Sequence, residues 1–373
     1  MNNKNDKRLL SIEVLRILGC LVVIGCHIKL NDLVDGNPVW IRVFFSCLFG
    51  DGVAIFWFIL GFFSFAKEES YPVRLKKMAS RILLPLFVYT MISFYFAGFL
   101  INGKPLLESM SHSIADYRTM ITRCLFRWQN RVEYGGHLWY LYVYAIVILL
   151  FPALAGFQKL WKGNKKNARI AWFCFLALLA VNDFTYNELC DFSHHSFPAA
   201  VAAAIFVLAG SIVAEFKDEI YGNGKYVRLG AAMFFVTLAV RVPWLYFSYW
   251  LGKGDEPCYW YTSFSLISIT GLFFMVLGAI GESRGPEWCR KPILYLADTT
   301  FMIYIVHSMV ITYLNDRDLY TFLEDVTGNI VTDTIIFQLG LMLEVFLVSF
   351  VVAAIVNLLL KLPGSLRGKQ KEA

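Results

Sequence analysis

Several kinds of pattern are missing from this 373-residue chain. Its eight cysteines form no CxxC pair and no cluster with histidines, which argues against a metal site. No long polar stretch separates the apolar segments, so the sequence offers no candidate for a separate soluble module. Internal repeats and low-complexity segments are absent as well. What remains is a succession of closely spaced apolar segments.

Charge is also scarce. Only 17% of the residues are charged, whereas 58% are hydrophobic and 17% aromatic, and the mean hydropathy is +0.56. These values are typical of polytopic membrane proteins rather than soluble domains. The net charge of +6 does not indicate nucleic-acid binding, because the basic residues lie in short loops instead of along one face.

Ten apolar segments are long enough to be considered as membrane spans. They cover residues 9–30, 40–66, 82–101, 137–157, 170–181, 197–216, 229–249, 261–281, 295–314 and 334–360. The fifth segment is short and has the weakest hydropathy signal. We therefore expect an all-α polytopic transmembrane bundle of about ten spans. It should occupy residues 1–373 as a single integral membrane domain with no fused soluble domain.

The loop charges predict the orientation of these spans. Lysine and arginine are concentrated at 74–81, 159–169, 217–228, 284–291 and in the C-terminal tail, which are alternate loops of the ten-span arrangement. The positive-inside rule then places these loops and both termini in the cytoplasm.

One loop departs from this rule. The segment 102–136 should lie outside, yet it carries Lys104, Arg118, Arg123, Arg127 and Arg131. Their spacing is typical of an amphipathic helix on the membrane surface. Such a helix either contacts lipid headgroups or clamps an anionic acceptor.

Arg16 and His27 both lie in the first apolar segment. Eleven positions turn an α-helix about 20° past three full turns, so both side chains share one face, about 16 Å apart along the axis. Polar groups within a membrane are expensive and usually mark a functional site. His27 is a candidate base, acid or nucleophile. Glu13 lies one turn from Arg16 and is positioned for an ion pair with it.

Further polar side chains lie within the later segments. Arg241, two residues before Pro243, and Glu344 each need a partner, so either Arg241–Glu344 or Arg16–Glu344 is a candidate pair, as is a direct role. A kink at Pro243 would open a cavity beside Arg241. His307 is a second inward-facing imidazole candidate. Trp139 and Tyr140 suit an interfacial aromatic belt, which leaves His137 unexplained.

In combination, five motifs resemble acyltransferase family 3, a family of polytopic membrane acyltransferases. In chain order they are Glu13, Arg16 and His27 of the first segment, FWFILGF at 56–62, RLKKMASRILLP at 74–85, HLWYL at 137–141 and FMIYIVH at 301–307. Leu60 stands where the family usually has serine, and Lys77 and Arg81 replace the usual Arg-x-x-Arg spacing. The resemblance spans the whole chain.

The resemblance implies transfer of an acyl group, often acetyl, from cytoplasmic acyl-CoA to a sugar hydroxyl outside the plasma membrane of a bacterium. The acceptor would be a cell-surface polysaccharide or a lipid-linked glycan, and no metal is expected. His27 would act as base or transient acyl carrier, with Arg16 and Glu13 completing the catalytic set. The expected donor contacts are Arg74, Lys77 and Arg81, and the candidate substrate contacts are His137, Trp139, Arg241, His307 and Glu344.

Two further expectations follow from the same resemblance. Family members often carry an extracellular esterase-like domain, and its absence here implies that the membrane part suffices or that a separate extracellular transferase partner completes the reaction. The alternative function is transport of a small amino acid, because the membrane half of the vancomycin-resistance serine racemases is similar to this family. Arg16 and Arg241 would then hold the carboxylate, and Glu344 or His27 would handle a proton.

Overall fold

The computed structural model describes residues 8–65, 69–126, 135–184, 196–252, 261–282, 285–315, 317, 323 and 325–369. The expected all-α fold is confirmed, because most of the described residues are helical and only two very short strands occur among them. The strands β1 (Leu33–Val34) and β2 (Asn37–Pro38) form a small antiparallel hairpin that pairs Leu33 with Pro38. Its turn residues Asp35 and Gly36 both have positive φ, as tight hairpin turns require.

The α-helices follow one another with short connections. They are α1 Leu10–His27, α2 Trp40–Phe49, α3 Gly52–Ser64, α4 Tyr71–Met78, α5 Leu84–Leu100, α6 Leu106–Ser109, α7 Ile114–Ile121, α8 Trp139–Leu149, α9 Phe151–Gln158, α10 Lys165–Phe184, α11 Ser196–Glu215, α12 Lys217–Ile220, α13 Gly224–Trp250, α14 Ser263–Ile280, α15 Glu287–Asn315 and α16 Ile330–Lys369. Two π-helical turns, η2 (Ala79–Leu83) and η3 (Thr122–Phe126), and the 3-10 turn η4 (Gly136–Leu138) complete the elements used below.

Each of the ten predicted segments falls on a helix or on a pair of helices. Seven helices in the described residues are long and apolar enough to cross a membrane. The pair formed by α8 and α9 would be an eighth, bent by 63° where Pro152 follows the break. α2 and α3 together cover the second segment and break at Gly50 and Asp51.

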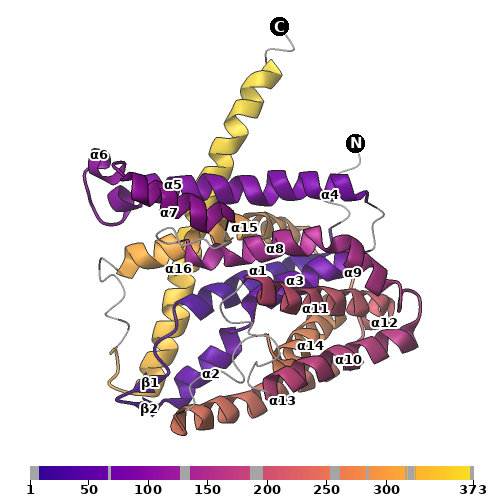
Figure 1. Cartoon of the computed structure of the whole chain (residues 1–373). Helices are drawn as coiled ribbons and strands as arrows, with labels where there is room; N and C mark the ends of the chain where they lie inside the picture. Colours follow the sequence, from indigo (N-terminus) through magenta and orange to yellow (C-terminus); the bar gives the residue numbers. More distant parts are fainter. Residues whose placement is uncertain are drawn as a thin grey trace.

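The helices form a bundle with two distinguishable ends (Figure 1). At the His27 end lie the β-hairpin, α6 and α7, whereas the Leu10 end holds α9, α12 and the beginning of α4. α1, α3, α8 and α11 lie in the middle, and the continuous stretch α4–η2–α5 runs along one side. α16 extends beyond the other helices toward the C-terminus.

Glycine allows the central helices α3 and α11 to approach closely. A Cβ atom added at Gly61 would lie 1.8 Å from the carbonyl oxygen of Val207, and one added at Gly210 would lie 2.1 Å from that of Phe58. Small residues at contacts between membrane helices permit this close backbone packing. Gly61 thus has a packing reason to be present in the FWFILGF motif.

The basic segment 102–136 contains the helical pieces α6, α7 and η3, whereas residues 102–105 and 110–113 are not helical. The predicted helix is therefore present in part. α7 begins with a capping box in which the Ser113 hydroxyl accepts from the Asp116 N–H and the Asp116 carboxylate accepts from the Ser113 N–H. Arg127 and Arg131 lie outside the described residues.

Candidate functional site

α1 carries Arg16 and His27 on one continuous helix, and the two residues mark opposite parts of the site. Glu13, only 4% exposed, forms ion pairs of 3.1 Å with Arg16 and 2.8 Å with Arg8. Arg8 also pairs with Asp298 of α15 at 2.7 Å. The local Glu13–Arg16 pair predicted from the spacing is therefore present, and it fixes Arg16 toward the Leu10 end.

Three imidazoles from distant parts of the chain meet at the C-terminus of α1. The ring centroid of His27 lies 5.2 Å from that of His307 on α15 and 6.3 Å from that of His137 on η4. The rings of His137 and His307 are 4.7 Å apart. The structure thus brings together three histidines that the sequence indicated only as separate candidates.

Backbone carbonyls orient two of these rings. His137 Nε2 lies 3.0 Å from the Ile305 carbonyl oxygen, and His307 Nδ1 lies 2.7 Å from that of Tyr304. Because a carbonyl only accepts, each of these nitrogens carries a proton and donates. The opposite nitrogens, His137 Nδ1 and His307 Nε2, are buried without a partner and are hydrogen-bond acceptors in the neutral rings.

The three histidines differ in access. His307 is 0% and His137 6% exposed, whereas the side chain of His27 is exposed. His27 is therefore the member that a substrate can reach, and the other two lie behind it. In the part of the chain that the structure describes, no group of three or more histidine, cysteine, aspartate or glutamate side chains is arranged to hold a metal ion.

A series of tyrosine rings connects the histidines to the arginines nearer the Leu10 end. Tyr304 lies 5.6 Å from His137 and 5.6 Å from Tyr140, and Tyr140 lies 6.2 Å from Tyr144. The Tyr304 hydroxyl also donates to the His137 carbonyl oxygen, which ties α15 to η4. At the far end of this series, Tyr144 is partly buried and lies within electrostatic range of Arg74, Arg16 and Arg81.

The three predicted donor contacts have different surroundings. Arg74 donates to the Ser64 carbonyl oxygen at 2.6 Å and lies 3.9 Å above the Phe151 ring, so it anchors α4 to the bundle. Lys77 is paired with Glu69. Arg81 is exposed on the π-helical turn η2 and has no ion pair within the described ranges. Of the three predicted donor contacts, Arg81 is therefore the most available to an anionic ligand.

Arg241 does not pair with Glu344. Its Nη1 atom lies 2.5 Å from the Asp51 carboxylate and donates to the Cys47 carbonyl oxygen at 3.3 Å. Asp51 also accepts from the Ser265 hydroxyl at 2.7 Å. Arg241 is only 1% exposed, so its charge is held inside the bundle by these partners. This network joins α2, α3, α13 and α14, whereas Glu344 is partly exposed on α16.

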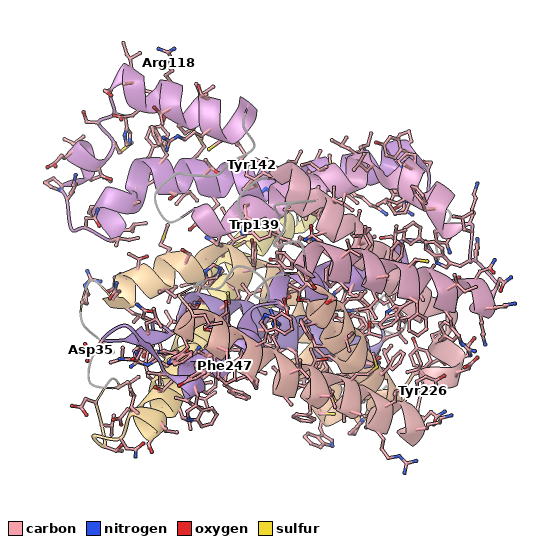
Figure 2. All side chains as sticks on the ribbon, turned by 60° about the horizontal axis from the view of Figure 1, so that its bottom comes forward. Asp35, Arg118, Trp139, Tyr142, Tyr226 and Phe247 are labelled. Carbon is pink, nitrogen blue, oxygen red and sulfur yellow. The ribbon has the colours of Figure 1, made fainter. Side chains whose placement is uncertain are left out.

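Two aromatic residues of the HLWYL motif have unexpected positions. The Trp139 ring lies edge-on to Trp57 at 6.2 Å and tilted to Tyr261 at 6.1 Å. Figure 2 places Trp139 toward the middle of the molecule. Tyr140 is buried, 6.0 Å from Trp57. The expected interfacial belt is wrong for Tyr140, because its ring packs among the central helices.

Sequence reasoning missed three residues near the site. Tyr304 lies within the FMIYIVH motif, where only His307 was considered. Tyr144 lies one turn from Tyr140, and that i, i+4 spacing was a usable signal for a shared face. Tyr89 of α5, whose ring lies edge-on to His137 at 6.2 Å, had no such signal, because its role depends on how α5 packs.

Comparison with known proteins supplies one match. The model of acyltransferase family 3, described as an acyltransferase domain, matches residues 9–356, nearly the whole chain. No curated protein and no solved structure matches it.

Proposed function

Because the chain belongs to acyltransferase family 3, a family of membrane acyltransferases, we propose that it acylates a glycan hydroxyl with acyl-CoA as donor, acetyl-CoA in the simplest case. The observation that carries the proposal is the position of His27. Its accessible imidazole lies in a histidine cluster, and a series of tyrosine rings extends from that cluster to Tyr144, toward Arg16 and Arg81.

The loop charges support the direction of transfer. The positive-inside rule favours a cytoplasmic position for the Leu10 end, on the side where acyl-CoA is available. In this proposal the membrane is the plasma membrane of a bacterium. Arg81 and Arg16 are then the cations that meet the donor's phosphates, because arginine suits bidentate phosphate binding. The His27 end faces outward, where a cell-surface polysaccharide or a lipid-linked glycan supplies the hydroxyl.

His27 supplies the chemistry in this proposal. Its imidazole takes the proton from the acceptor hydroxyl, whose oxygen attacks the thioester carbonyl carbon as a new C–O bond forms. The C–S bond breaks, and His27 returns the proton to the leaving sulfur, which departs as free CoA thiol. The unpartnered acceptor nitrogens of His307 and His137 belong to the same cluster, and in this proposal they stabilise the protonated form of His27.

A second route has the acyl group pass through His27 itself. The His27 nitrogen then attacks the thioester, CoA leaves as the thiol, and the acceptor hydroxyl attacks the acyl-imidazole. The two routes differ in one observable, since only the second leaves labelled protein after incubation with donor alone. Acid-free quenching followed by mass analysis of the α1 peptide distinguishes them.

The test of the proposed function uses purified protein, radiolabelled acetyl-CoA and envelope glycan. We expect the wild type to transfer label, and His27→Ala to lose transfer by about 100-fold or more, because general-base catalysis typically contributes that much. Arg228→Ala, which removes an exposed cation from the start of α13, is the control and should retain activity. No transfer by the wild type, together with saturable serine uptake in vesicles, would contradict the enzyme and favour transport.

The same assay decides whether a partner is needed. Transfer to glycan by the purified chain shows that it is sufficient. Labelled His27 without transfer to glycan would indicate that a separate extracellular transferase completes the reaction.

A further inference from the structure

A polar pocket opens at the His27 end of the bundle, separate from the cluster of His27, His137 and His307. It has a volume of about 400 Å³ and lies between the last turns of α5 and the helices α6, α7 and η3. Its wall includes Ser93, Phe94, Lys104, His112, Asp116 and Arg123. In Figure 2 this helical group stands at the upper left, with Arg118 at its outer edge.

The pocket adjoins the histidine cluster through two elements. Ser93 on its wall lies one turn of α5 from Tyr89, whose ring is edge-on to His137. Cys124, also on its wall, is hydrogen-bonded to Tyr142 of α8, where the helical group meets the rest of the bundle (Figure 2). A molecule held in the pocket therefore borders the same helices that hold the proposed catalytic centre.

The acidic groups of the pocket are already engaged. Glu108 lies 3.8 Å from Lys104 as an i, i+4 pair. Asp116 accepts hydrogen bonds of 2.8 and 2.9 Å from the Ser113 hydroxyl and N–H, which hold the pKa of its carboxyl below the ordinary value. Neither carboxylate is left to repel an anion at full strength.

Two nitrogen groups remain free on the pocket wall. Arg123 has no ion pair in the part of the chain that the structure describes. His112 Nε2 is a buried atom without a partner. The His112 ring is held in place by Phe94, stacked on it at 3.9 Å, and by Tyr117 at 6.1 Å. A fixed imidazole and a free guanidinium form a preorganised binding pair for an anion.

We propose that this pocket binds the acceptor of the acyl group through an anionic substituent, a carboxylate or phosphate on the sugar, held by Arg123 and His112. The inference rests on the proposed function for the identity of its ligand as acceptor. The polar wall and the volume suit a sugar ring, and Arg123 supplies the bidentate contact that both anions favour.

Binding is measured first, without donor, by isothermal titration of the detergent-solubilised full chain. The probes are glucuronate, glucose 1-phosphate and glucose. We expect at least one charged sugar to bind about tenfold or more tightly than glucose, because hydrogen bonds to charged groups contribute most. Which charged probe binds more tightly identifies the anion as carboxylate or phosphate.

The variants Arg123→Gln and His112→Gln should each weaken binding of the charged sugar, Arg123→Gln by about tenfold or more. Arg123→Lys retains the charge and should recover part of the loss, which separates recognition from a folding defect. Arg118→Gln is the matched control, because Arg118 lies on α7, which runs directly into η3, but at the outer edge of the molecule (Figure 2).

Two results would overturn the pocket assignment. If Arg118→Gln and Arg123→Gln weaken binding of the charged sugar equally, the anion is attracted by the general positive charge of this surface, as lipid headgroups would be, and not by the pocket. Equal affinities for glucose and for both charged sugars would show that the pocket does not recognise an anionic substituent. If Arg123-dependent binding occurs but no acyl group is transferred, the pocket stands and the proposed function fails.

Discussion

The ring of His307 lies 5.2 Å from the ring of His27, and its Nε2 atom is buried without a hydrogen-bond partner. His307 Nδ1 is committed to the Tyr304 carbonyl oxygen. The tertiary fold thereby presents a basic nitrogen beside the accessible imidazole, and backbone geometry alone decides which nitrogen that is.

Two amide substitutions test this tautomer. His307→Asn retains a donor near the Nδ1 position and removes the acceptor, whereas His307→Gln places an amide near the Nε2 position. We expect kcat to fall by about tenfold or more in His307→Asn and less in His307→Gln, with the KM for acyl-CoA unchanged in both. Equal kcat values in the two variants, at equal thermal stability, would show that Nε2 has no part in the reaction.

Arg81 and Lys77 should differ as donor contacts. Lys77 is already paired with Glu69, whereas Arg81 has no ion pair among the described residues. Arg81→Gln is therefore expected to raise the KM for acyl-CoA by about tenfold, and Lys77→Gln by less. Steady-state kinetics at varied acyl-CoA measure both. A KM unaffected by either change would remove η2 from the donor site.

The buried pair of Asp51 and Arg241 should dominate stability. Asp51→Asn leaves the Arg241 charge buried without its counter-ion, which costs about 3–5 kcal/mol when one partner of such a pair is lost. Thermal unfolding in detergent should show a clear drop in Tm. The double variant Asp51→Leu with Arg241→Met should recover part of it.

Asp298→Asn is the control for that experiment. Asp298 pairs with Arg8, but its side chain is 63% exposed, so its loss should cost at most about 1 kcal/mol. Equal Tm losses for Asp51→Asn and Asp298→Asn would show that burial does not increase the contribution of the Asp51–Arg241 pair to stability.

Gly61→Ala should separate α3 from α11. The added methyl group would meet the Val207 carbonyl oxygen, which is backbone and has no room to move, so overpacking by about 1–3 kcal/mol or more is expected. Gly156→Ala is the matched control, because a Cβ there has no atom within 4 Å. That change should be neutral or stabilise α9 by up to about 1 kcal/mol. Folded yield and Tm report both effects.

The helices and the local part of the site were accessible from the sequence. Apolar segment length predicted the positions of the helices, and helical phase predicted the Glu13–Arg16 pair, because both depend on neighbours within a few turns. The partner of Arg241 was not accessible, since Glu344 was the candidate considered from the sequence, and only the packing of α13 against α2 brings Asp51 to Arg241. The burial of Tyr140 was hidden for the same reason, because hydropathy does not report which helices surround a helix end.

The continuity of α1 has a consequence for the kind of donor that the enzyme accepts. The helix is unbroken from Leu10 to His27, so the spacing of about 16 Å along the axis between Arg16 and His27 is fixed. A helix cannot shorten to bring the two ends together. On the proposed function, the substrate itself must cover that length, with its phosphates at one end and its reactive carbonyl at the other. A small activated acid such as an acyl phosphate is too short to do so. The length of the helix between Arg16 and His27 would therefore select against such a donor.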